Sequence, residues 1–145
     1  MAHIVTEWHD DAKTIMRVTY QPGWTWRDLE ANLPTEEQFL DSVDHKVDVI
    51  ADFRDTQLPP GAISHLPKIA QSPPYVHPNS GEVVMVGSPI FMEEVVGVYK
   101  RVYGQASKLT MVHDLHEAQE IILKRREEAA KSAPQDEADD SGAKA

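Results

Sequence analysis

Residues 47–53 read VDVIADF, a nearly continuous run of apolar and β-branched side chains. Such a run is typical of a central strand that is buried on both faces of a sheet. Two later runs, VVMVG at 83–87 and KLTMVH at 108–113, have the same character. Because a segment with helical character separates each run from the next, we expect the three strands to lie parallel in one sheet.

The chain before this strand begins with the pattern of a β-hairpin. HIVTEWH at 3–9 and KTIMRVTY at 13–20 alternate apolar and polar residues, and Asp10, Asp11 and Ala12 lie between them. Alternation with a period of two is the signal of a strand that is buried on one face. We therefore predict two antiparallel strands ahead of the parallel ones.

A helix is predicted between the hairpin and the strand at 47–53. Thr25 and Asp28 have the spacing of an N-cap and its N3 acid, and Trp24 and Leu29 are placed to form a hydrophobic staple. Pro34 interrupts the apolar stripe that follows. Since proline lacks a backbone N–H, we expect a kink or a break at this position.

Three more helices are expected later in the chain. The first spans 60–71, and the second spans 88–104 with Ser-Pro at its start as N-cap and N1. Asp114 is the predicted N-cap of the last helix, with Glu117 at N3. The proline-rich stretch 72–82 is expected to connect two of these elements with little regular structure.

The order is therefore a hairpin followed by α-β-α-β-α-β-α. This order predicts an α/β fold with a mixed, mostly parallel sheet of about five strands. A chain of 145 residues suits one domain, which we place at 1–130. Apart from Pro134, residues 131–145 contain no apolar side chain larger than alanine, so they are expected to form a disordered acidic tail.

Composition narrows the classes of partner. The chain has 24 acidic residues against 14 Lys and Arg, for a formal net charge of −10. This charge repels phosphate backbones and anionic headgroups, which argues against nucleic acid as a partner and against a membrane surface. The chain has no cysteine and no stretch of about 20 apolar residues, so we expect a cytoplasmic protein that does not insert into a membrane.

The order of elements resembles that of the STAS domain, the fold of anti-sigma-factor antagonists. The resemblance covers about residues 3–126. It rests on the opening hairpin, on WTWRDLEANL before VDVIADFRD, on LPPGAISHL after it, and on VVMVGSP and KLTMVHDLHEAQEII. The chain is similar to small stand-alone bacterial proteins of this type. The resemblance implies a non-catalytic, cofactor-free regulatory module that binds a protein partner.

In the anti-sigma-factor antagonists, a hydroxyl at the start of the helix after the third strand is phosphorylated. Here Pro59, Pro60 and Gly61 occupy that place, with Thr56 before them and Ser64 after them. The usual phosphorylatable residue is therefore not matched. We instead predict that this loop and helix start bind a partner, through Arg54, Asp55, Thr56, Gln57, Leu58, Gly61 and Ser64.

Three alternatives remain open. The first is a receiver-like phosphoacceptor domain, with Asp52 as acceptor and Asp10 or Asp11 holding Mg²⁺. The second is a carrier that encloses a small apolar or lipid-like ligand between helices and sheet. The third concerns assembly, because an uncovered edge strand in the hairpin would permit a homodimer. No set of residues has the spacing of a catalytic centre, so we do not predict an enzyme.

Overall fold

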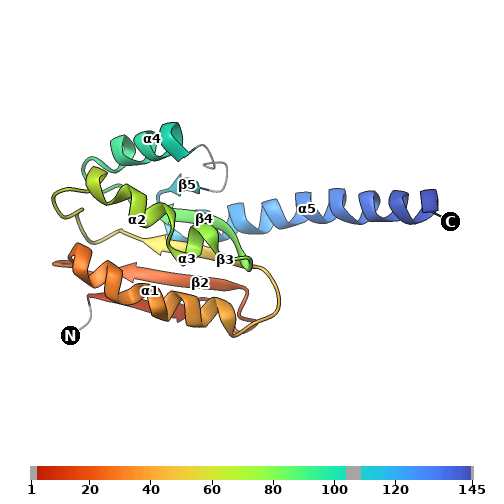
Figure 1. Ribbon diagram of the computed structural model, residues 1–145, viewed down its shortest axis with the longest axis horizontal. Coiled ribbons are helices and arrows are strands. Elements are labelled where there is room, and N and C mark those ends of the chain that lie inside the picture. The colour runs from red at the N-terminus through yellow and green to blue at the C-terminus, as the bar shows by residue number, and fades with distance from the viewer. Residues whose placement is uncertain (1–2, 104–108, 145) are drawn as a thin grey trace.

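The computed structural model describes residues 3–103 and 109–144, with the backbone alone described over 132–144 (Figure 1). Five strands are present: β1 Ile4–Trp8, β2 Ile15–Tyr20, β3 Val47–Asp52, β4 Ser80–Val86 and β5 Leu109–Val112. The helices are α1 Trp26–Asp41, α2 Leu66–Ala70, α3 Pro73–Val76, α4 Met92–Tyr103 and α5 Leu115–Lys144, with a 3₁₀ turn at Ile63–His65.

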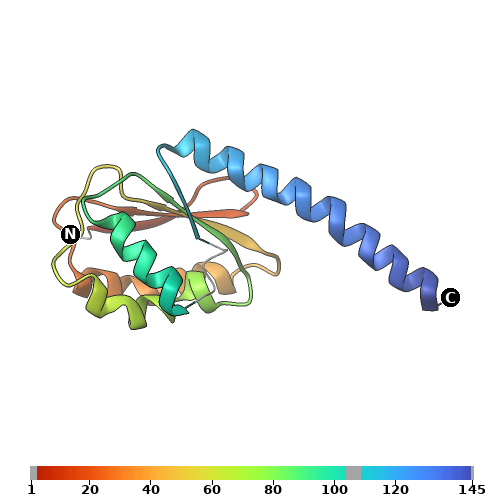
Figure 2. The same cartoon turned by 90° about the horizontal axis from the view of Figure 1, so that it is seen from above.

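The five strands form one sheet in the order β1-β2-β3-β4-β5. β1 and β2 pair antiparallel, and the other neighbours pair parallel, which confirms the predicted fold class. Each parallel connection moves one strand further in the same direction. Because such crossovers are right-handed, α1 to α4 all lie on one face, and α5 covers the other (Figure 2).

Two apolar clusters hold these layers together. The larger lies between the sheet and α1 to α4, and it includes Trp24, Leu40 and Val49. The smaller lies under α5, where Ala118 and Ile122 contact the opposite face of the sheet. All six residues of β3 are buried, as expected for a strand that is covered on both faces.

The first helix begins as the sequence predicts. Thr25 caps it, and Asp28 completes the capping box by accepting a hydrogen bond from the Thr25 backbone. Of the predicted kink or break at Pro34, the break is wrong, because α1 runs unbroken past it. Pro34 and Glu30, whose carbonyl loses its hydrogen bond, are both exposed, so water can replace the missing N–H.

The helices that follow β3 and β4 begin later than predicted. The 3₁₀ turn at Ile63–His65 and then α2 replace a helix from Pro60, because Gly61 has a φ of 87° that no helix allows. The predicted connection at 72–82 contains α3. The helix predicted from Ser88 begins at Met92, since Phe91 has a φ of 71°. The predicted end at Gly104 lies outside the described residues.

The last helix is capped by Asp114, whose carboxylate accepts the backbone N–H of Glu117 at 2.8 Å. It continues to Lys144 and so spans nearly all of the predicted disordered tail, apart from Ala145 outside the described residues. Residues 117–131 are rich in alanine, glutamate, lysine and arginine, which favour helix, and the packed start of α5 removes the cost of nucleation; Pro134 and Gly142 further along do not favour helix. None of the helices in the described part of the chain has the length and apolarity to span a membrane.

Candidate functional site

Asp52 ends β3 at the carboxyl edge of the sheet, where it is buried. Its Oδ1 accepts from the Arg54 Nε at 3.0 Å and from the Arg54 backbone at 3.1 Å, and its Oδ2 accepts from Nη2 at 2.9 Å. These hydrogen bonds raise the pKa of the Arg54 guanidinium. The carboxylate predicted as a phosphoacceptor is therefore already bound by a cation of its own chain.

Asp10 and Asp11 lie at the other end of the sheet. They form the hairpin turn, where Asp10 accepts the backbone N–H groups of Thr14 and Ile15. In the parallel pairing of β2 with β3, Ile15 lies opposite Asp48 and Thr19 opposite Asp52. The structure thus does not bring the three predicted acids together. Over residues 3–103 and 109–144, no three His, Asp or Glu side chains are grouped to hold a metal ion.

The loop after β3 is held in place by the start of α1. The Trp26 Nε1 donates to the Pro60 carbonyl at 2.7 Å, and the Trp26 ring stacks on His65 with centroids 4.5 Å apart. The Ser64 hydroxyl donates to the Gly61 carbonyl at 2.8 Å. The proline corner is therefore a fixed surface.

The predicted partner-binding residues divide by exposure. Arg54, Asp55, Gln57, Gly61 and Ser64 are exposed. Leu58 is half-buried, and Thr56 is buried at 7% exposure with its hydroxyl 3.4 Å from the Gln21 carbonyl. Thr56, which was predicted to bind the partner, is therefore not part of the accessible surface. Of the two hydroxyls considered, that of Ser64 is accessible.

A second segment joins this loop at the same edge. The Gln57 Oε1 accepts the backbone N–H of Ile90 at 2.9 Å. A side chain at Gly87 would collide with the Arg54 backbone, so glycine permits the two segments to approach. We call residues 54–64 and 87–91 together the rim.

Three large apolar side chains project from the rim into solvent. Ile63 is 50% exposed, Ile90 64% and Phe91 70%. The exposure of these three side chains was not predicted from the sequence, because all three lie within predicted helices whose inner faces would be buried. The positive φ of Phe91 holds this residue in a conformation that is unusual for a bulky side chain.

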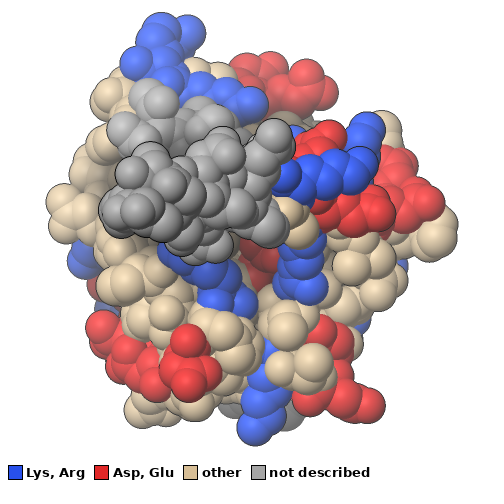
Figure 3. Space-filling view, turned by 90° about the vertical axis from the view of Figure 1, so that its right-hand side faces the viewer, with Lys and Arg blue, Asp and Glu red and all other residues tan. Residues whose placement is uncertain are grey.

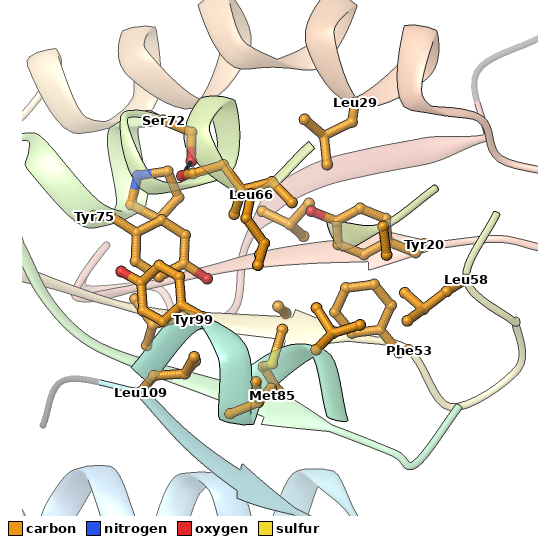
Figure 4. A pocket seen from close by; sticks show the side chains of 18 of the residues that line it. Tyr20, Leu29, Phe53, Leu58, Leu66, Ser72, Tyr75, Met85, Tyr99 and Leu109 are labelled. Carbon is orange, nitrogen blue, oxygen red and sulfur yellow. Dashed lines mark hydrogen bonds between the residues drawn. The ribbon is translucent and has the colours of Figure 1, made fainter. Parts of the chain in front are cut away.

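A cavity of about 70 Å³ lies between the sheet and α1 to α4 (Figure 4). Tyr20 and Phe53 stand at one end of it in the figure, and Tyr75 and Tyr99 at the other. Leu58 and Ala62 also line it, so the cavity extends to the rim. Most of its wall is aliphatic or aromatic, and one carboxyl group lies among these side chains.

That carboxyl belongs to Glu36, which is 3% exposed. Its Oε2 accepts from the Asn32 Nδ2 at 2.8 Å, and the same amide nitrogen donates to Thr6 at 2.9 Å. Burial raises the pKa of Glu36 to about 7, which the Asn32 hydrogen bond only partly offsets. Sequence analysis missed this residue, although its helical spacing from Leu29 and Leu40 places it on the apolar stripe of α1.

Other polar groups also lie in this wall. Burial raises the pKa of the Tyr20 and Tyr75 hydroxyls, and the nearby Glu36 charge raises both further. The Trp24 Nε1 is buried and has no hydrogen-bond partner among the described residues. A buried donor without a partner is rare, because it loses its hydrogen bond to water and gains nothing in return.

On the face viewed from the outer end of α5, positive and negative side chains are mixed. Figure 3 shows Lys and Arg interspersed with Asp and Glu there. Arg125 and Arg126, the most basic part of the sequence, are bound to Glu82 and Asp48. Neither a scan against protein-family models nor a search of curated proteins finds a match for this chain.

Proposed function

We propose that this protein is a non-catalytic regulatory module, STAS-like in type, that binds a protein partner through the rim. The observation that supports it best is the exposure of Ile63, Ile90 and Phe91 on two segments joined by a hydrogen bond. Contiguous apolar side chains rimmed by polar ones are typical of a protein-binding surface. The STAS resemblance and a cytoplasmic location are parts of this proposal.

The construction of the rim also favours binding. Proline, the Trp26–His65 stack and the Trp26–Pro60 hydrogen bond hold the loop before a partner arrives. A surface that is already ordered loses less conformational entropy on association. Around the apolar centre, Asp55, Gln57 and Ser64 are exposed and can form the polar border of an interface.

The proposed binding does not use a phosphorylation switch of the usual kind. Pro59, Pro60 and Gly61 replace the hydroxyl cluster, and Thr56 is buried. The exposed hydroxyl of Ser64 donates within the turn. The module is therefore proposed to bind its partner constitutively through apolar contacts.

The test is a comparison of binding by three forms of the full chain. The rim variant combines Ile63→Lys with Phe91→Asn, where asparagine tolerates the positive φ. The control variant combines Val76→Lys with Val102→Asn, whose side chains are 58% and 62% exposed outside the rim. Proteins captured by the immobilised chain from its native host extract are quantified by mass spectrometry.

We expect the rim variant to lose at least tenfold of a partner that wild type and the control variant both retain. A rim variant that retains every partner would contradict the proposal. Light scattering on the same three proteins tests whether the partner is a second copy. A homodimer that the rim variant abolishes supports the rim, whereas one that it leaves intact points to the edge strand β1.

A further inference from the structure

The wall of the cavity contains one charged group and no group of opposite charge. Among the described residues that line the cavity, Glu36 is the single ionisable residue of the types Asp, Glu, His, Lys and Arg. Its one hydrogen-bond donor is the neutral amide of Asn32. A buried carboxyl without a cation destabilises the folded protein, and such groups are concentrated at functional sites.

Aromatic rings line the same cavity as this carboxyl. Tyr20 stacks on Phe53 with centroids 4.2 Å apart and meets Trp24 edge to face at 4.8 Å. At the other end of the cavity, Tyr75 and Tyr99 have centroids 5.5 Å apart. The faces of such rings attract cations, most strongly where water is excluded. The wall therefore offers a carboxylate and π-faces, which are the two kinds of group that bind an organic ammonium ion.

The same wall disfavours other classes of ligand. A carboxylate or phosphate ligand would meet Glu36 without any basic side chain to balance it. A purely apolar ligand would leave the buried Glu36 carboxyl with the Asn32 amide as its one hydrogen-bond donor. The net charge of −10 adds a field that attracts cations toward the protein.

We propose that the cavity between the sheet and α1 to α4 binds a small, mainly apolar ammonium compound, whose charged nitrogen donates to Glu36. The cavity volume of about 70 Å³ sets the size of the ligand. A cavity of about 150 Å³ holds benzene, so this one accommodates roughly three or four non-hydrogen atoms without rearrangement. This binding is separate from the proposed partner binding at the rim.

The probe for this site is n-propylamine, with n-propanol and acetate, which also have four non-hydrogen atoms, as neutral and anionic compounds of matched size. Binding to the full chain is followed by NMR of the side-chain methyl groups. Leu29, Leu66 and Met85 line the cavity, whereas Leu123 and Val102 are exposed elsewhere. A ligand of this size is expected to have a Kd no tighter than tens of micromolar, so titration extends to tens of millimolar.

We expect propylamine to shift the cavity methyls in a saturable manner and the exposed methyls not at all. Glu36→Gln should weaken this binding at least tenfold, because it removes the charge and retains the shape. Glu37→Gln, the next residue on the same helix and exposed, should leave binding unchanged. Propanol should bind at least tenfold more weakly, and acetate should cause no shift.

Three results would overturn the proposal. Equal binding of propylamine and propanol would show that the cavity selects apolarity and not charge. Equal binding of propylamine by wild type and Glu36→Gln would show that the carboxylate does not hold the amine. Shifts absent from the cavity methyls would show that the amine does not bind in the cavity. These outcomes are independent of the rim variants, so failure here leaves the proposed partner binding to its own test.

Discussion

Glu36 shows how one residue can oppose the stability of the fold around it. Its carboxyl lies on the apolar stripe of α1, with one amide hydrogen bond. Its pKa is raised from 4.5 to about 7 by burial, so between these pH values the folded chain binds a proton that the unfolded chain releases. Its contribution to the free energy of unfolding therefore falls as pH rises through that window.

Substitution of Glu36 by glutamine should remove its contribution to the pH dependence of stability. At pH 8 we expect Glu36→Gln to be more stable than wild type, whereas at pH 4 the difference should be small. The change in difference between the two pH values should be roughly 3 kcal/mol, from the size of the pKa rise. Urea unfolding at several pH values measures it, with Glu37→Gln as the control that keeps the wild-type profile. Parallel profiles for Glu36→Gln and wild type would contradict the prediction.

At the scale of the element, α5 is attached to the sheet by two adjacent arginines whose acidic partners differ in burial. The Arg126 Nε donates to Asp48 at 2.8 Å, and its Nη2 donates to the Thr14 carbonyl at 2.8 Å. Asp48 is 8% exposed, and Gly81 leaves room for its carboxylate because any side chain there would collide with it. The Arg125–Glu82 pair is about one-third exposed on both sides.

This difference predicts unequal losses on truncation to alanine. Arg126→Ala leaves the buried Asp48 without its cation, which should cost about 2 kcal/mol after allowance for the partial exposure of Arg126. Arg125→Ala breaks a more exposed pair and should cost less than about 1 kcal/mol. Chemical denaturation of the two variants provides the comparison. If Arg125→Ala proves as damaging as Arg126→Ala, burial of the pair is not what anchors α5.

At the scale of the whole molecule, the outer half of α5 extends beyond the sheet (Figure 1). Its described contacts with the body are made by Leu115, Ala118, Ile121, Ile122, Arg125 and Arg126. The next side chains, from Glu127 to Lys131, are all exposed. The layers of the domain are therefore complete within the first three turns of this helix.

A chain that ends after Lys131 should retain the stability of the full chain. We expect its thermal midpoint to change by less than about 2 °C, the effect of well under 1 kcal/mol in a domain of this size. A chain that ends after Ile121 should instead be unfolded, because it lacks Ile122 and both arginines. Calorimetry and circular dichroism test the pair. A large loss of stability for the longer form would mean that the outer helix packs on the domain.

The sequence by itself determined the strands, their order and the helix caps. VDVIADF, the hairpin pattern, Thr25 with Asp28, and Asp114 are local signals, since hydrophobic period and capping depend on a few neighbouring residues. Pro34 and the helix starts at Met92 and Leu66 went against the local expectation. There, solvent at an exposed carbonyl and positive φ values outweighed the propensity of the segment.

Only the tertiary structure decided where the sites lie. The rim exists because β3 and β4 end side by side, which brings Gln57 to Ile90 and turns Ile63 and Phe91 outward. The cavity exists because α1 to α4 share one face, so Glu36 meets rings from β2 and from α3. Contacts between residues that are distant in the chain depend on the handedness of the crossovers and on packing, so a local sequence pattern does not predict them.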